Sequence, residues 1–429
     1  MAAYIPIDKI EVEIWGKRVG AVVLDPSSGY YVFSYYPHFV KLGIELAPIM
    51  MPLSFEPYVF QFLPELTYKR LPALLSDALP DDFGNSLVDA WMAQRGVSKE
   101  SITALDRLGY MGKRSMGALE FKPSRTKVTS SRTAIDLSKL VEVARRSVSG
   151  DFQTDAMSEA ALNQIIQVGT SAGGARAKAA IAWNPDTKEI RAGQFDVAPD
   201  FEHWLLKFDG VGTDLALGSS QDYGRIEMAY YLMATTAGIT MSPCRLIEEN
   251  GRAHFMTKRF DRDVNKKIHM TTLCAMAHLD YKQKATHDYA QYFMVISKLG
   301  LGYLAMEEAF RRMTFNVMAA NCDDHTKNHS FIMAESGSWQ LAPAYDVTHA
   351  YSPASEWTHQ HLMSVNGKFK GITREDLLAV ANRFGIGTAK KVIHEVGEAV
   401  SNWMEFARET GVDHNEASII KSHHIQYDR

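Results

Sequence analysis

The chain has 429 residues, with 46 Lys and Arg against 50 Asp and Glu, which gives a formal charge of −4. Its 46% hydrophobic and 22% charged residues are close to the globular average and argue against wholesale disorder. The near-neutral charge excludes a protein that coats nucleic acid by charge alone, although it leaves room for a local basic patch. The length allows about two or three domains.

The cysteine content and the hydropathy pattern indicate the compartment. Three cysteines and no CxxC pair cannot build a disulfide framework or a cysteine zinc site, which predicts a reducing, cytoplasmic environment. No apolar run reaches the length of about 18 residues that a membrane span needs. The N-terminus also lacks the basic-then-apolar pattern of a secretion signal. We therefore expect a cytoplasmic location and no membrane contact.

The N-terminal region is predicted to be rich in β-structure. Period-two alternation and turn clusters indicate strands at residues 10–14, 17–24 and 30–36. A helical pattern then runs through Trp91 and Met92 to Gly96, which would cap it. The basic, Ser/Thr-rich residues 122–132 indicate an exposed linker or hairpin, and we place a domain boundary near residues 125–150.

The rest of the chain first alternates and then becomes helical. The expected helices are at residues 137–143, 158–167, 223–237, 376–384 and 388–403, with an apolar helix ending near Ala320. The expected strands are at residues 177–183, 203–208, 244–247 and 254–260, with a short hairpin around Ile332 and Trp339.

The segment at residues 321–328 (NCDDHTKN) carries the most informative motif. Asp323 and Asn328 lie five apart, and a further acid, Asp346, follows in residues 341–346 (LAPAYD). Phosphoryl transfer to a hydroxyl needs one carboxylate at the hydroxyl, and an amide and a second carboxylate that hold magnesium. Asp323 would be the base, and Asn328 and Asp346 the Mg²⁺ ligands. Considered one at a time, Asp323 and Asp346 could equally be structural residues, the first at the end of a helix and the second in a turn.

Two further features fit a nucleotide site. Residues 168–178 (VGTSAGGARAK) form a glycine-rich loop in which Gly173 and Gly174 would let backbone amides approach phosphate, although the loop is neither a Walker A nor a G-x-G-x-x-G motif. Lys207 stands in an apolar strand, where an unpaired lysine is costly. It could hold ATP phosphates with Glu227 as its partner, or simply face solvent on an edge strand.

The segment at residues 256–262 (MTKRFDR) follows a strand and leaves two interpretations open. It could be a hinge whose backbone binds adenine. Its charges at Arg259, Asp261 and Arg262 could equally form a structural salt-bridge cluster. His325 and His329 are spaced like a metal pair, but no glutamate base stands between them as in the H-E-x-x-H motif, so zinc is disfavoured.

Taken in order, these motifs resemble the HipA family of serine/threonine kinases, the toxins of bacterial type II toxin–antitoxin pairs. The N-terminal half agrees, with residues 79–84 (LPDDFG) and 107–119 (RLGYMGKRSMGAL). The resemblance implies an α+β fold: a small N-terminal β-rich subdomain, then a phosphatidylinositol-kinase-like α/β core with an all-helical C-terminal lobe. We expect these parts at residues 1–125, 126–265 and 266–429.

The resemblance also implies ATP, Mg²⁺ and a role for each matching residue. Asp323 takes the catalytic position, and Asn328 and Asp346 the metal positions. The nucleotide positions fall on Lys207 for the phosphates, Lys258 and Phe260 at the adenine hinge, His325, and the loop residues Gly173, Gly174 and Ser171. Ser171, with Thr170 as second choice, falls at the family's autophosphorylated serine, where an added dianion would repel ATP and switch the kinase off.

The same resemblance implies the partners of the protein, and the sequence differs from the family pattern at two positions. A HipB-like helix-turn-helix antitoxin would carry most operator-DNA contact, and a protein serine would be the substrate, with an aminoacyl-tRNA synthetase as one candidate. Asp324 stands where many members have glycine, and Arg176 where some have glutamine. Three alternatives stay open: a small-molecule kinase of the aminoglycoside or choline type, a non-catalytic corepressor that binds antitoxin and DNA, and an AMP transferase on a kinase-like fold.

Overall fold

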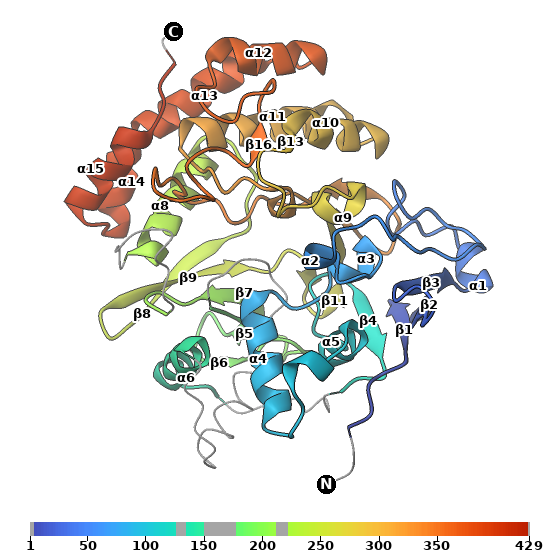
Figure 1. Cartoon of the computed structure of the whole chain (residues 1–429). Coiled ribbons are helices and arrows are strands. Elements are labelled where there is room, and N and C mark those ends of the chain that lie inside the picture. The colour runs from blue at the N-terminus through green and yellow to red at the C-terminus, as the bar shows by residue number, and fades with distance from the viewer. Residues whose placement is uncertain (1–3, 126–133, 150–176, 212–221, 428–429) are drawn as a thin grey trace. The chain divides into compact units, whose positions relative to one another are not determined.

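The computed structural model describes residues 4–125, 134–149, 177–211 and 222–427. The described chain divides into two compact units. Figure 1 labels helices and strands of both. The first unit comprises Met1–Thr213, Lys258–Thr271 and Ile332–Ser338, and the second comprises Asp214–Thr257, Thr272–Phe331 and Trp339–Arg429. Both units are mixtures of helices and strands.

The first unit opens with an antiparallel sheet in the order β3-β2-β1-β4. Its strands are β1 Lys9–Ile14, β2 Lys17–Leu24, β3 Tyr31–Tyr35 and β4 Leu119–Lys122. The alternation in β1 explains the packing, because Ile10, Val12 and Ile14 are at most 1% exposed while the charged residues between them face outward. The three strands predicted before residue 36 are therefore confirmed.

Helices and a second set of strands complete the first unit. The helices are α1 Pro37–Val40, α2 Glu65–Tyr68, α3 Ala73–Ser76, α4 Asp82–Ala93, α5 Ala104–Met111 and α6 Leu137–Ser149, with a 3₁₀ turn at Lys99–Ser101. The strands are β5 Lys178–Trp183, β6 Ile190–Ala192, β7 Glu202–Lys207, β10 Arg262–Asp263 and β11 Lys266–Lys267. β5 pairs antiparallel with both β6 and β7, and every residue of β5 is buried. The helix predicted at residues 158–167 lies outside the described residues.

The second unit is dominated by helices. They are α8 Tyr223–Thr236, α9 Leu273–Ala277, α10 Tyr289–Lys298, α11 Gly302–Met318, α12 Arg374–Arg383, α13 Ala389–Ser401, α14 Trp403–Thr410 and α15 His414–His423. α11 packs against α13, and α8 packs against α14. The helix predicted over residues 388–403 is interrupted at Asn402, where the chain turns from α13 into α14. None of the helices in the described part of the chain is long and apolar enough to cross a membrane.

The remaining strands lie in the second half of the chain. They are β8 Cys244–Glu249, β9 Arg252–Lys258, β12 His269–Thr272, β13 His287–Asp288, β14 Ser330–Met333, β15 Trp339–Leu341 and β16 Met363–Ser364. β9 ends at Lys258, so the strand predicted to reach Phe260 is two residues too long. Beyond Lys258 the Arg259 backbone nitrogen still donates to the His203 oxygen of β7 at 2.9 Å, and the side chains of Arg259 and Asp261 are buried and hydrogen-bonded to each other.

Candidate active site

The segment after α11 forms the centre of the candidate site. Ala320 adopts a left-handed backbone, with φ of 52°, and this turns the chain out of the helix before Asn321. A 3₁₀ turn at Thr326–Asn328 then brings Asn328 back toward Asp323. The Asn328 side-chain nitrogen donates to the Asp323 backbone oxygen at 2.8 Å. This bond fixes the orientation of the amide and leaves its oxygen as a ligand for a hard cation.

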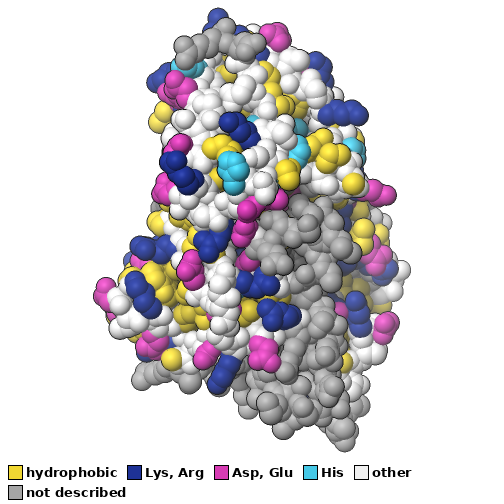
Figure 2. Space-filling view, turned by 90° about the vertical axis from the view of Figure 1, so that its left-hand side faces the viewer, with side chains coloured by type: hydrophobic (Ala, Val, Ile, Leu, Met, Phe, Trp, Pro, Cys, Tyr) yellow, Lys and Arg dark blue, Asp and Glu magenta, His cyan; other side chains and the backbone are white. Residues whose placement is uncertain are grey.

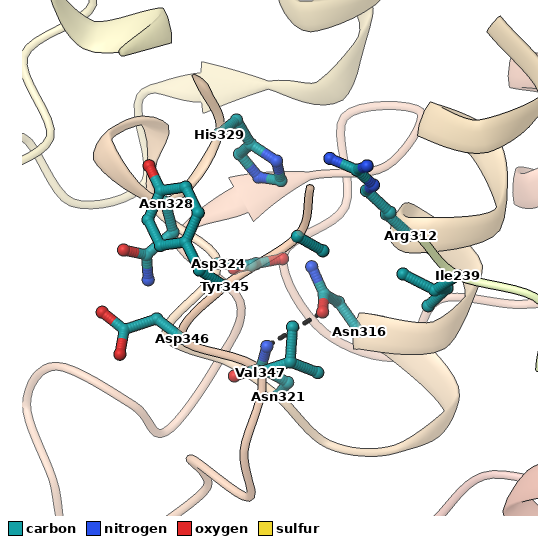
Figure 3. Close-up of a pocket in the computed structure, with 11 residues that line it drawn as sticks. Ile239, Arg312, Asn316, Asn321, Asp324, Asn328, His329, Tyr345, Asp346 and Val347 are labelled. Atoms are coloured by element: carbon teal, nitrogen blue, oxygen red, sulfur yellow. Dashed lines mark hydrogen bonds between the residues drawn. The ribbon is translucent and has the colours of Figure 1, made fainter. Parts of the chain in front are cut away.

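The second acid is held against this turn by its neighbour. The Tyr345 hydroxyl donates to the Lys327 backbone oxygen at 2.8 Å and also contacts the Ser330 hydroxyl. Asp346 has a left-handed backbone with φ of 54°, a conformation that aspartate tolerates better than most residues and that recurs at functional sites. Figure 3 shows the Asn328 amide and the Asp346 carboxylate on the same side of a small pocket that both residues line. The structure thus brings the two predicted metal ligands together.

This donor set fits a magnesium ion better than a metal bound by protein alone. In the described part of the chain, no group of three or more His, Cys, Asp or Glu is arranged to hold a metal ion. One amide oxygen and one carboxylate leave most positions of an octahedral ion to water and phosphate oxygens, which is how Mg²⁺ is held in phosphoryl-transfer sites. Asn328 and Asp346 are the residues that would hold it.

Asp323 has the environment of a general base. Its side chain is 39% exposed, and its Oδ1 accepts a hydrogen bond of 2.7 Å from the indole nitrogen of Trp357. The pKa of the Asp323 carboxyl is raised above its usual value, chiefly because surrounding protein atoms displace water. The nearby carboxylate of Asp346 acts in the same direction, whereas His325 and the indole N–H oppose the rise. A raised pKa improves a carboxylate as a proton acceptor.

Asp324, the residue next to the candidate base, is a buried anchor. It is 1% exposed and accepts hydrogen bonds from the Tyr289 hydroxyl at 2.8 Å, from His361 Nδ1 at 2.9 Å and from the Leu362 backbone nitrogen at 2.8 Å. Burial lowers the pKa of His361, but the Asp324 charge outweighs it and the pKa is raised well above its usual value. Sequence reasoning noted Asp324 only as a departure from the family pattern and missed this role.

A second layer of amides supports Tyr289. Asn316 donates to the Tyr289 hydroxyl at 2.9 Å. Asn321 in turn donates to Asn316 at 2.9 Å (Figure 3). Asn316 and Asn321 are at most 6% exposed, so their hydrogen bonds form away from water and hold the start of the motif rigidly. His325 packs its ring 5.1 Å from the ring of Tyr281. Nothing in the spacing of the sequence indicated Tyr289 or Trp357.

The predicted nucleotide residues other than His325 belong to the first unit or lie outside the described residues. Lys207 ends β7 and stands opposite Lys178 in the antiparallel register. Lys258 Nζ lies 2.6 Å from Glu202 Oε1, and Phe260 follows it after the end of β9. Gly173, Gly174, Thr170 and Ser171 lie outside the described residues. The nucleotide roles of these residues, and the partnership of Lys207 with Glu227, stay predictions.

The charges of the 256–262 segment form a buried cluster. Asp261 is 0% exposed and pairs with Arg259 at 2.6 Å and with Arg262 at 2.7 Å. It also accepts the Gly117 backbone N–H at 2.8 Å, and Arg262 donates to the Gly117 oxygen at 3.1 Å. The structural alternative is therefore the one that the geometry supports for these charges. The cluster ties residues 259–262 to the loop that precedes β4.

Two family models match the chain, and they cover both halves of it. The HipA-like C-terminal domain matches residues 170–404, and the HipA N-terminal domain matches residues 10–122. The first match alone spans more than half of the sequence. The chain belongs to the HipA family. The resemblance inferred from the motifs is thereby confirmed.

One solved structure has the same fold as this HipA-family chain, and a second aligns only weakly. A structure described as the toxin–antitoxin system HipA, HipB and operator DNA of Shewanella oneidensis MR-1 aligns with a TM-score of 0.66 at 18% identity, covering 96% of this chain and 94% of that chain. The Helicobacter pylori proinflammatory kinase CtkA aligns with a TM-score of 0.34 at 12% identity, covering 58% of this chain and 93% of that chain. No curated protein matches the sequence significantly. The first alignment confirms the predicted fold class.

Proposed function

We propose that this HipA-family chain is an ATP-dependent serine/threonine protein kinase that acts as the toxin of a toxin–antitoxin pair. The observation that carries the proposal is the arrangement of Asp323, Asn328 and Asp346. The Asn328 amide is locked by its bond to the Asp323 backbone, and Asp346 is held beside it through Tyr345. Both proposed metal ligands therefore lie next to a carboxylate that could take a proton from a hydroxyl.

The roles of the residues follow from their chemistry. Asp323 would orient the acceptor hydroxyl and take its proton. Asn328 and Asp346 would hold Mg²⁺, which neutralises charge on the transferred phosphoryl group when bound. Lys207, Lys258, Phe260, His325 and the loop glycines Gly173 and Gly174 are the proposed nucleotide contacts. Ser171 is the proposed site of autophosphorylation, with Thr170 as second choice.

The proposed partners rest on family membership. The similar Shewanella structure contains HipA with HipB and operator DNA, which supports a HipB-like antitoxin for this chain. On the face shown in Figure 2, Lys and Arg side chains are interspersed with Asp and Glu among the described residues. This mixture and the charge of −4 favour DNA contact mainly through the antitoxin. The substrate would be a protein serine, with an aminoacyl-tRNA synthetase as one candidate.

The decisive test is phosphate transfer by the Asp323→Asn variant. We expect the wild type to label itself from γ-labelled ATP and to arrest growth when expressed without an antitoxin. Asp323→Asn should lose transfer by at least about a hundredfold, because the proton acceptor is removed while the shape is kept. Asp196→Asn, which changes an exposed aspartate, is the matched control and should behave as wild type. Near-normal labelling by the Asp323 variant would contradict the proposal.

Three measurements separate this proposal from the other functions. In the intact mass, a gain of phosphate supports a protein kinase, and peptide mapping tests whether it lies at Ser171 or Thr170, whereas a gain of AMP indicates an AMP transferase. Rapid phosphorylation of a sugar or amine without self-labelling would indicate a small-molecule kinase. Growth arrest that is unchanged in Asp323→Asn would indicate a non-catalytic corepressor.

A further inference from the structure

We propose that Trp357 is a positioning residue for the catalytic carboxylate, presented by its own turn on a segment that Asp324 anchors. The inference rests on the phosphoryl transfer proposed above and adds to it a residue that no motif indicated. Trp357 is 34 residues from Asp323 along the chain, and both belong to the second unit.

The indole distinguishes the two oxygens of Asp323. Trp357 Nε1 donates to Oδ1 at 2.7 Å, and His325 Nε2 lies 3.7 Å from the same oxygen. An indole nitrogen can only donate, so this bond favours the ionised carboxylate. No residue that the structure describes donates a hydrogen bond to Oδ2. Oδ1 is thus hydrogen-bonded within the protein, and Oδ2 is the oxygen that could take the proton of an acceptor hydroxyl.

The turn that carries Trp357 is closed by its own hydrogen bonds. The Ser355 hydroxyl accepts the backbone N–H groups of Trp357 and Thr358, each at 3.1 Å. The Ser352 backbone nitrogen donates to the Thr358 oxygen at 3.3 Å, and the Thr358 side chain is buried. The indole is therefore presented by a local structure that does not depend on the bond to Asp323.

The same segment is anchored a few residues later by Asp324. This buried carboxylate accepts from His361 Nδ1 at 2.9 Å and from the Leu362 backbone nitrogen at 2.8 Å. Because Asp323 and Asp324 are adjacent, the two anchors share one rigid piece of backbone. A movement of Trp357 away from Asp323 would strain the buried bonds of Asp324. Asp324 therefore anchors the segment that carries Trp357 to the piece of backbone that carries the base.

The expected consequence is a selective loss of catalytic rate. A carboxylate with one oxygen fixed has lost the freedom to rotate away from the acceptor, and small misplacements of a base are costly. Trp357→Phe removes the N–H but keeps an aromatic ring beside His325, whose ring centre lies 6.2 Å from that of Trp357. The variant thus isolates the hydrogen bond from the ring contact. Trp339→Phe is the matched control, since it makes the same change on β15.

The test measures phosphate transfer from γ-labelled ATP to the chain itself and to casein, with ATP affinity by calorimetry and melting temperature in parallel. Trp357→Phe should lower kcat about tenfold or more while KM and Kd for ATP stay within about twofold and the melting temperature is unchanged. Trp339→Phe should match the wild type in all four quantities. Ser355→Ala, which loosens the turn without touching the carboxylate, should give a smaller fall in kcat and is the second variant if Trp357→Phe is poorly folded.

The outcomes separate this inference from the proposed function. If the Trp357 and Ser355 variants both have a kcat within about twofold of the wild-type value, the positioning role is overturned while the kinase proposal stands. A fall that tracks lost ATP affinity or lost stability also overturns it, because it indicates a structural role. A wild-type chain that neither binds Mg·ATP nor transfers phosphate overturns the proposed function, and the positioning role with it.

Discussion

At the scale of single residues, the buried charge of Asp261 has a structural role. Its carboxylate is fully enclosed between Arg259 and Arg262. Burial alone would raise the pKa of this carboxyl, but the two guanidinium groups outweigh burial and hold the pKa well below its usual range. The carboxylate therefore stays ionised throughout the neutral range.

We expect Asp261→Ala to destabilise the first unit by about 3–5 kcal/mol, because two buried guanidinium groups lose their partner. Urea unfolding at neutral pH measures this change. Asp263→Ala is the matched control, because Asp263 is an exposed acid two residues along the same segment and should change stability by less than about 0.5 kcal/mol. Equal effects of the two variants would show that the buried cluster contributes nothing specific.

At the scale of elements, close approach between α8 and β9 depends on one glycine. Gly224 lies in the first turn of α8, and a Cβ at this position would come 2.0 Å from the Ala253 backbone oxygen on β9. Because that neighbour is backbone, the helix itself would have to move away from the strand. The helix signal in the sequence predicted α8 correctly but carried no information about this contact.

Gly224→Ala should therefore destabilise the second unit by roughly 1–3 kcal/mol, as overpacking does in cores, although alanine is the better helix former. Gly387→Ala is the control, because the nearest atom to its added Cβ is the Tyr303 hydroxyl at 4.0 Å. Thermal unfolding of the two variants gives the comparison. A stability of Gly224→Ala equal to or above that of the wild type would show that α8 is not held at this distance.

At the scale of the whole molecule, buried histidines should make stability depend on pH. Burial lowers the pKa of His349 to about 3 and the pKa values of His329 and His424 to about 4. In the unfolded chain these groups titrate near 6.5, so the unfolded state binds more protons as the pH falls below that value. Their contribution is complete above about pH 6.5 and is lost toward pH 4. His361, whose pKa is raised, opposes this loss.

Each of these three histidines, His329, His349 and His424, should thus lower the free energy of unfolding by roughly 2 kcal/mol between pH 7.5 and 5. Urea unfolding at the two pH values measures the fall. His424→Gln should reduce the fall in the free energy of unfolding, because it removes one of these titrating groups. Tyr230 donates its proton to the Ala319 oxygen at 2.6 Å, so the neutral ring of His424 must donate to Tyr230. His414→Gln, at an exposed position of α15, should leave the fall unchanged, and equal falls in both variants would refute the assignment.

Local patterns in the sequence were sufficient to identify the family and to predict most helices and strands, because these depend on neighbouring residues and on the period of each element. The spacing of Asp323 and Asn328 is one such local pattern. Only the tertiary structure showed that Asp324 is an anchor, since its partner His361 is 37 residues away. The bond from Trp357 to Asp323 spans a similar distance along the chain. Such contacts form where the folded backbone brings distant segments together, and no periodicity or spacing in the sequence records them.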